Sequence, residues 1–445
     1  MSQHKLVLLL IATLLVVGGS HLSSTLNQTP AVSSPASVTL GLEDAAPVLR
    51  MKTTGELIEF WKGRFERDPR DFISLTYLGE AYIRQGRETG DVSAYERAEA
   101  TLRRSLEINS RYEPTLAYLS AAVFVKHDFQ GALELASRVY AADPRALQAL
   151  ATMGDAQLEL GRYAEAEAAY RQLADKSLSP PVYSRLARLA WLQGRPDEAL
   201  ALMQQAVDES ARMGLSGENA AWYHAQLGEL YFNTGQLEPA DTRYAAALDA
   251  FEGYYPALAG RGKIRAAQGR YDEAIEFYER LVAMLPQPEF LAALGDLYTV
   301  TGRPEEAQRQ YDTVEFIGKL EAINQVIYSR QLALFYANHD RKLRESLGLA
   351  EKELAVRKDI YAYDTLAWAL HKNGRNAEAA EAMEQALKLG TRDAPLYYHA
   401  GMIYKASGDY ARAQTMLSEA LAINPHFDLV QAQIARLTLA NIGTD

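Results

Sequence analysis

Cysteine is absent from this chain of 445 residues. Its absence excludes disulfides, thiolate metal sites, cysteine nucleophiles and a lipid-modified signal sequence. A block of basic residues is lacking too, and 57 acidic against 46 basic side chains give a formal net charge of −11. The chain therefore lacks the electrostatic footprint of a nucleic-acid-binding protein, and no nucleic-acid partner is expected.

The N-terminal apolar run is too short for a typical membrane span. His4 and Lys5 precede apolar residues 6–17, and small residues 18–20 follow. A spanning helix needs about 20 apolar residues, whereas this order is typical of a secretory signal peptide. We interpret residues 1–20 as a signal peptide or N-terminal membrane anchor. The sequence thus predicts an exported protein, periplasmic or extracellular, with anchoring to the membrane by residues 6–19 as the open alternative.

Composition changes twice after this segment. Residues 21–52 are rich in Ser, Thr and Pro and poor in large apolar side chains, which predicts a flexible linker. From residue 53 the spacing of Ile58, Trp61 and Phe65 is helical, and Asp68 and Pro69 follow as a stop signal, so a helix is predicted over 53–70.

The rest of the chain repeats itself with a period near 34 residues. A small residue is followed by a second small residue some twelve or more positions later, and by an aromatic or large apolar residue four further on. The first small residue of each copy is Gly79, Ser120, Gly154, Ala187, Gly228, Gly262, Gly295, Ala333, Ala367 or Gly401. Ten copies at spacings of 33 to 41 residues indicate a repeat architecture rather than several separate cores.

This pattern resembles the tetratricopeptide repeat, a helix–turn–helix unit of 34 residues, over residues 71–425. Good copies carry Leu294, Gly295, Tyr298, Ala307 and Tyr311 at the characteristic positions. The resemblance implies an all-α, right-handed superhelical solenoid of about ten repeats. Residues 426–445 are expected to form a C-terminal capping helix and tail. The segment 389–403, with an insertion in the first repeat and a weak eighth repeat, also resembles exported bacterial proteins of this kind.

Sequence motifs for catalysis are missing. The chain contains no Gly-x-Ser-x-Gly, no His-Glu-x-x-His and no Gly-x-x-x-x-Gly-Lys-Ser/Thr motif. His371, His399 and Asp364 are weak as metal ligands because two imidazoles on different helices do not define a site. No enzyme activity, cofactor or metal is therefore expected.

In proteins with this repeat, function usually lies on the concave face lined by the first helix of each unit. The residues that face this groove at one repeated position are Glu80, Ala121, Asp155, Arg188, Glu229, Lys263, Asp296, Leu334, Trp368 and Met402. In the middle of this row the charges alternate, and Arg188 and Lys263 are long enough to bridge acidic neighbours. We interpret the middle as a self-compensating charge ladder, with a polar ligand track as the alternative.

The C-terminal end of the same row is apolar and gives the candidate binding site. Its residues are Leu334, Tyr361, Asp364, Trp368, His371, Tyr398, Met402 and Lys405. One hypothesis is a pocket for an apolar side chain of a peptide or partner helix, with charged groups at its edge. The other is that the capping helix packs here, or that the aromatic residues fill space between repeats.

These observations predict a non-enzymatic scaffold that is exported across the membrane and binds a protein or peptide partner of the cell envelope on its concave face. The alternative function is a membrane-tethered accessory subunit of a polysaccharide assembly or export machine. Under either hypothesis the membrane is contacted only through the N-terminal segment, if that segment stays uncleaved.

Overall fold

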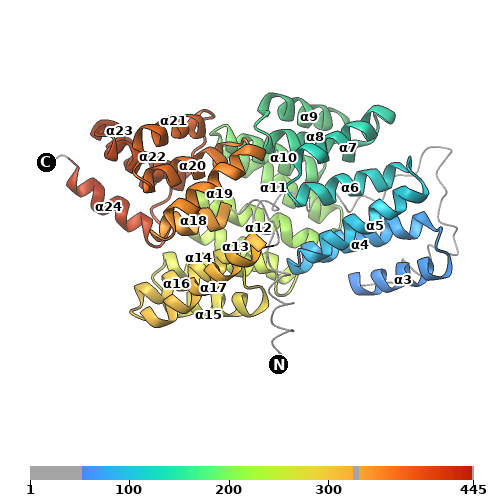
Figure 1. The fold of residues 1–445 in the computed structure, drawn as a ribbon, viewed down its shortest axis with the longest axis horizontal. Coiled ribbons are helices and arrows are strands. Elements are labelled where there is room, and N and C mark those ends of the chain that lie inside the picture. Colours follow the sequence, from blue (N-terminus) through green and yellow to red (C-terminus); the bar gives the residue numbers. More distant parts are fainter. Residues whose placement is uncertain (1–52, 324–329, 443–445) are drawn as a thin grey trace. The chain divides into compact units, whose positions relative to one another are not determined.

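The computed structural model describes residues 53–323 and 330–442, and these residues form 22 α-helices and no strand (Figure 1). In chain order the helices are α3 (Thr54–Arg67), α4 (Phe72–Thr89), α5 (Ser93–Ile108), α6 (Glu113–Val125), α7 (Phe129–Ala142), α8 (Leu147–Glu159), α9 (Tyr163–Lys176), α10 (Pro180–Leu192), α11 (Pro196–Arg212), α12 (Glu218–Asn233), α13 (Leu237–Ala250), α14 (Tyr255–Ala267), α15 (Tyr271–Met284), α16 (Pro288–Val300), α17 (Pro304–Ile323), α18 (Arg330–Asn338), α19 (Leu343–Val356), α20 (Ile360–Lys372), α21 (Asn376–Leu387), α22 (Ala394–Ala406), α23 (Tyr410–Ile423) and α24 (Gln431–Asn441).

The helices from α4 to α23 form ten consecutive helix–turn–helix pairs, with α3 before them and α24 after them. The expected all-α repeat fold is therefore confirmed. The small residues of the repeat allow the two helices of a pair to pack closely. A Cβ added to Gly79 would stand 2.5 Å from Leu102, and one added to Gly295 would stand 2.3 Å from Tyr311. Any larger residue at these positions would force the pair apart.

The turn inside most pairs has a glycine in the left-handed backbone region. Gly161, Gly194 and Gly302 have φ values of 72°, 69° and 75°, a conformation that other residues adopt only at a cost. In the eighth pair this turn is formed without glycine, and Asp340 and Lys342 take positive φ values of 52° and 40° instead.

The chain divides into two compact units. Among the described residues, the first comprises 53–157 together with 164–173, and the second comprises 158–163, 174–323 and 330–442. In the first unit, Trp61 of α3 stacks on Tyr77 of α4 with ring centroids 5.1 Å apart. Because this contact covers the apolar face of the first repeat, α3 closes the N-terminal end of the unit's core.

Within the second unit, segments that are far apart in the sequence meet along a line of three contacts, which we call the seam. The side chain of Arg357 donates to Glu159 Oε2 at 2.6 Å, across 198 residues of sequence. Thr391 Oγ1 donates to the carbonyl of Leu192, across 199 residues. Asn424 Nδ2 donates to the carbonyl of Phe232 at 2.8 Å, across 192 residues. Each contact joins the turn inside one repeat to the end of the repeat five units later.

The seam contains a buried network of charges. Arg357 lies 3.6 Å from Asp359 and 3.7 Å from Glu353, besides its bond to Glu159. Arg330 adds a second guanidinium, 2.7 Å from Glu353 and 2.9 Å from Asp359. The three carboxylates and Arg357 are each no more than 5% exposed as side chains. The two arginines hold the pKa of Asp359 below its usual value despite its burial, which favours the charged form of this carboxylate.

Candidate binding groove

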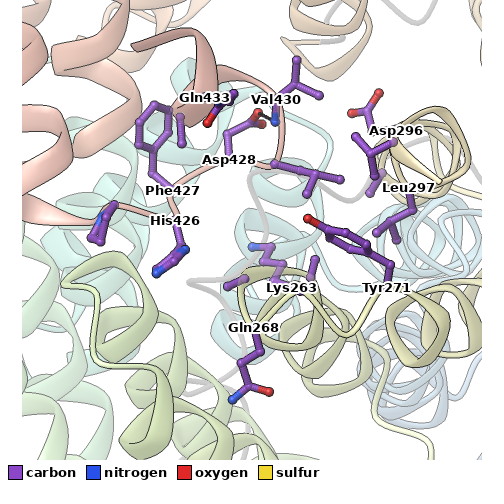
Figure 2. Close-up of a pocket in the computed structure, with 18 of the residues that line it drawn as sticks. Lys263, Gln268, Tyr271, Asp296, Leu297, His426, Phe427, Asp428, Val430 and Gln433 are labelled. Carbon is purple, nitrogen blue, oxygen red and sulfur yellow. Dashed lines mark hydrogen bonds between the residues drawn. The ribbon is translucent and has the colours of Figure 1, made fainter. Parts of the chain in front are cut away.

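A cavity of about 760 Å³ opens on the inner face of the second unit, and we call it the inner-groove pocket. One wall is formed by α14, α15 and α16 together with Phe232 of α12, and the opposite wall by residues 425–436. Figure 2 shows Asp428 and Val430 on one side and Lys263, Tyr271 and Asp296 on the other. The third seam contact fixes the spacing of these walls, because Asn424 bonds both Phe232 and the backbone N–H of His426.

Lys263, on the α14 wall, is neutralised by its neighbour. Its ammonium lies 3.1 Å from Glu229 Oε1, and the hydroxyl of Tyr244 donates to the same carboxylate at 2.7 Å. The carboxylate raises the pKa of Lys263 against the opposing effect of burial. The predicted bridge between Lys263 and an acidic neighbour is thus confirmed, and both groups stay charged.

The tyrosine–carboxylate bond recurs in other repeats. Tyr170 donates to Asp155 at 2.9 Å and Tyr311 donates to Asp296 at 2.7 Å, each across 15 residues as in the pair of Tyr244 and Glu229. The second helix of these repeats therefore orients the acidic residue at this repeated position of the first helix. This regularity could have been found in the sequence from the constant spacing, but it requires knowing which tyrosines point inward.

Asp296 also contacts a histidine of a neighbouring repeat. His339 Nε2 lies 2.8 Å from Asp296 Oδ1, while Nδ1 lies 2.8 Å from the carbonyl oxygen of Phe335. Both ring nitrogens face acceptors, an arrangement that favours the imidazolium, which can donate from both nitrogens. The pKa of His339 is accordingly raised, because the bonds to Asp296 and Phe335 outweigh the effect of burial.

Unlike Glu229 and Asp296, the nearby carboxylates of Asp428 and Glu289 have no charged partner in contact within the described part of the chain. Asp428 accepts hydrogen bonds from the backbone N–H groups of Val430 at 2.8 Å and Gln431 at 2.7 Å, at the start of α24. Burial raises the pKa of Asp428, with Asp296 contributing, and raises the pKa of Glu289 to about 7. Among residues 53–323 and 330–442, no ion pair with Lys, Arg or His involves either carboxylate.

The apolar candidates predicted from the sequence lie together, but in the core. Trp368 is 3% exposed and Tyr398 is 2% exposed, and Leu334 and Met402 pack against them. The same cluster includes residues of the capping region, namely Phe427, Ala435 and Leu439. The space expected for a partner's apolar side chain is filled by the chain itself, which matches the alternative that the capping helix packs here.

The polar candidates surround this cluster. Asp364 is buried and its Oδ1 lies 2.9 Å from His399 Nδ1. His371 stacks on Trp368 with centroids 5.1 Å apart, and burial lowers its pKa. Lys405 is partly exposed in the last turn of α22. Asp364 and His399 join α20 to α22, whereas His371 and Lys405 are only partly buried.

Tyr361 makes a further contact between distant repeats, outside the three seam contacts. Its hydroxyl accepts a hydrogen bond from Trp191 Nε1 at 3.1 Å and lies 3.3 Å from Asp393 Oδ2. The guanidinium of Arg188 lies 5.6 Å from the Tyr361 ring centroid. Arg188 therefore stacks on an aromatic ring of a distant repeat, where the charge ladder predicted a bridge to a neighbouring carboxylate.

The part of the chain that the structure describes contains no group of three or more His, Asp or Glu side chains arranged to hold a metal ion. Across residues 53–323 and 330–442, every helix is too short or too polar to span a lipid bilayer. The predicted signal peptide or anchor (1–20) and the linker (21–52) lie outside the described residues.

The sequence matches three family models, all described as tetratricopeptide repeat. One matches residues 179–253, a second matches 126–189, 265–318 and 366–440, and a third matches 225–289. Together these matches cover more than half of the chain and include every helix that lines the inner-groove pocket.

Two curated proteins are similar over part of their length. The human protein named Protein O-mannosyl-transferase TMTC1 is 28% identical over 219 residues, which are 47% of this chain and 24% of that protein. Tetratricopeptide repeat protein 8 of Caenorhabditis elegans is 30% identical over 95 residues, 21% of this chain and 19% of that protein. The chain thus spans about a quarter or less of each relative.

Solved structures give weaker similarity. BtubC (BKLC) from P. vanneervenii aligns with a TM-score of 0.37 and 21% identity, covering 45% of this chain and 91% of that one. Yeast Tom70 aligns with a TM-score of 0.32 and 13% identity, covering 83% of this chain and 96% of that one.

Proposed function

Because the chain belongs to the tetratricopeptide repeat family, we propose that it is a protein–protein interaction scaffold that binds an extended segment of a partner in the inner-groove pocket. The observation that carries the proposal is the pocket itself, a cavity of about 760 Å³ lined by Phe232, Lys263 and Asp296. These residues belong to the first helices of three successive repeats, the surface that repeat scaffolds use for binding.

The proposed mechanism is binding without turnover. The inward polar groups are held by neighbours, as Lys263 is by Glu229 and Asp296 by Tyr311 and His339, so the pocket wall is preorganised. Because only 24% of the human mannosyl-transferase is matched, its activity is not part of the proposal. The pocket can instead orient a partner segment through shape and fixed charges.

Site-specific photo-crosslinking in cells tests the proposal. Gln433 is exposed and lines the pocket, while Glu276 is exposed on α15 and does not line it. A photoreactive residue at Gln433 should capture a partner that one at Glu276 does not. The captured protein, once purified, should bind the unmodified chain and shield the side chain at position 433 from solvent. Equal capture at both positions, or no complex between the purified proteins, would refute a specific groove interaction.

We further propose that the scaffold is exported and meets its partner in the cell envelope. This part of the proposal is supported only by the order of charged, apolar and small residues over positions 4–20. Sequencing the N-terminus of the mature protein tests it. Loss of about the first 20 residues would support cleavage and export, an intact N-terminus in the membrane fraction would support the anchor, and an intact soluble protein in the cytoplasm would refute both.

A further inference from the structure

Among the residues that the structure describes, two carboxylates at the inner-groove pocket, Asp428 and Glu289, have no cation in contact. Glu229 and Lys263 form one pair, and Asp296 and His339 form a second. At the edge, exposed Arg436 donates to the carbonyl of Pro425, and burial lowers the pKa of His426, which favours the neutral imidazole. Asp428, on the wall formed by 425–436, and Glu289, whose charge acts on Lys263, are left without a cation.

The backbone amides that Asp428 accepts orient its carboxylate without neutralising it. Burial raises the pKa of both Asp428 and Glu289, because each pays a desolvation cost with no cation in contact. A cation placed beside Asp428 would remove this cost, since it restores the interaction that water supplied.

The edge of the same pocket is apolar and open. Val300 at the end of α16 is 42% exposed, and Val430 and Ile434 on the opposite wall are each 37% exposed. Figure 2 shows Val430 beside Asp428, so the free carboxylate and the apolar edge belong to one surface. A ligand that matches this surface carries a positive charge next to apolar groups.

We propose that the inner-groove pocket receives a lysine or arginine side chain from an extended partner segment, with Asp428 as its counter-ion and Val300, Val430 and Ile434 contacting the apolar side chains next to it. This inference rests on the proposed function and specifies the chemistry of the partner. A long basic side chain suits the pocket because its methylene stem packs on the apolar edge while its charged end reaches Asp428.

Binding of matched synthetic peptides to the full chain tests the inference. The probes are short, blocked peptides of one apolar sequence with a central lysine, norleucine or glutamate, measured by fluorescence anisotropy. The lysine peptide should bind at least about tenfold more tightly than the norleucine peptide, a difference that added salt reduces. The glutamate peptide should bind most weakly. Equal affinity for lysine and norleucine would overturn the inference.

Two variants with matched controls locate the site. Asp428→Asn keeps an acceptor for the amides at the start of α24 and should abolish the preference for lysine, whereas Asp128→Asn, at the cap of α7, should leave it unchanged. Ile434→Ser should weaken the binding of the lysine and norleucine peptides alike. Leu437 is 56% exposed and lies outside the pocket, so Leu437→Ser should weaken the binding of neither peptide. Equal effects of a variant and its control would overturn the assignment to this pocket.

The outcomes separate this inference from the proposed function. If a partner is captured at Gln433 but the peptides show no preference for lysine, the proposed scaffold function is supported and the cationic ligand is refuted. Binding of the lysine peptide that Asp428→Asn does not weaken would place the cation elsewhere and refute the role of Asp428. A lysine preference that Asp428→Asn removes, without partner capture at Gln433, would support the site and count against the proposed function.

Discussion

Replacing Gly194 by alanine should open the seam, and the structure supplies a control that isolates this effect. Gly194 and Gly302 occupy equivalent turns and have φ values of 69° and 75°. A Cβ at Gly302 would meet no atom within 4 Å, whereas a Cβ at Gly194 would stand 2.1 Å from the carbonyl oxygen of Gly390. Both substitutions strain the local backbone, but only Gly194→Ala forces two distant repeats apart.

The expected losses of folding stability follow from the backbone strain and from the overlap with Gly390. An alanine in the left-handed region costs roughly 1–2 kcal/mol, so Gly302→Ala should lower the free energy of unfolding by about that amount. Gly194→Ala adds an overlap with a backbone atom, which cannot rotate away as a side chain does. Overpacking of this kind typically costs a further 1–3 kcal/mol. Displacement of Gly390 should also break the neighbouring bond from Thr391 to the carbonyl of Leu192.

Urea unfolding followed by circular dichroism measures the total loss, and hydrogen exchange locates it. Exchange should accelerate over residues 388–394 in Gly194→Ala and stay unchanged there in Gly302→Ala. Local exchange is needed because a repeat array need not unfold in a single step. Equal destabilisation by the two variants, with unchanged exchange over 388–394 in both, would refute the conclusion that the seam stabilises the second unit.

Three further predictions concern buried groups. Arg357→Met leaves three carboxylates of the seam facing one another with Arg330 alone, so the free energy of unfolding should fall by about 3–5 kcal/mol; a loss below about 1 kcal/mol in urea unfolding would contradict a stabilising network. Glu289 has a pKa of about 7 in the folded state against a usual value of 4.5, so the folded state holds its proton more tightly than the unfolded state does. The free energy of unfolding should therefore decline as pH rises from about 4.5 to about 7, by at most roughly 3 kcal/mol. Glu289→Gln should flatten this decline, and an unchanged slope would contradict the raised pKa. Ala274→Leu should cost about 1–3 kcal/mol because Ala274 is fully buried, and an unchanged melting temperature would contradict the packing.

The repeat architecture could be predicted from the sequence because it is a local property. Each helix pair is specified within about 34 residues by small residues at the packing positions and glycine in the turn. The bridge between Lys263 and Glu229 was predictable for the same reason, since the two residues lie at equivalent positions of adjacent repeats. Contacts between neighbouring units follow directly once the register is known.

The seam and the role of Trp368 could not be predicted in the same way. Residues 192 to 199 positions apart meet only if small rotations between successive repeats add up to the right value, and no single repeat encodes that sum. An exposed groove position and a core position also look alike in sequence when the residue is a tryptophan. Trp368 is buried because residues 427–439 fold back over it, which the local pattern around position 368 does not reveal.

The seam has a consequence for how this protein can change its length. A free solenoid tolerates the gain or loss of a whole unit, because each unit contacts only its neighbours. Here the turns at Glu159, Leu192 and Phe232 each fit one particular partner further along the chain. Deleting one complete repeat between them would place every turn opposite the wrong partner, and Arg357 would lose its contact with Glu159. We therefore expect descendants of this chain to vary in surface loops and to keep the number of repeats between positions 159 and 424 constant.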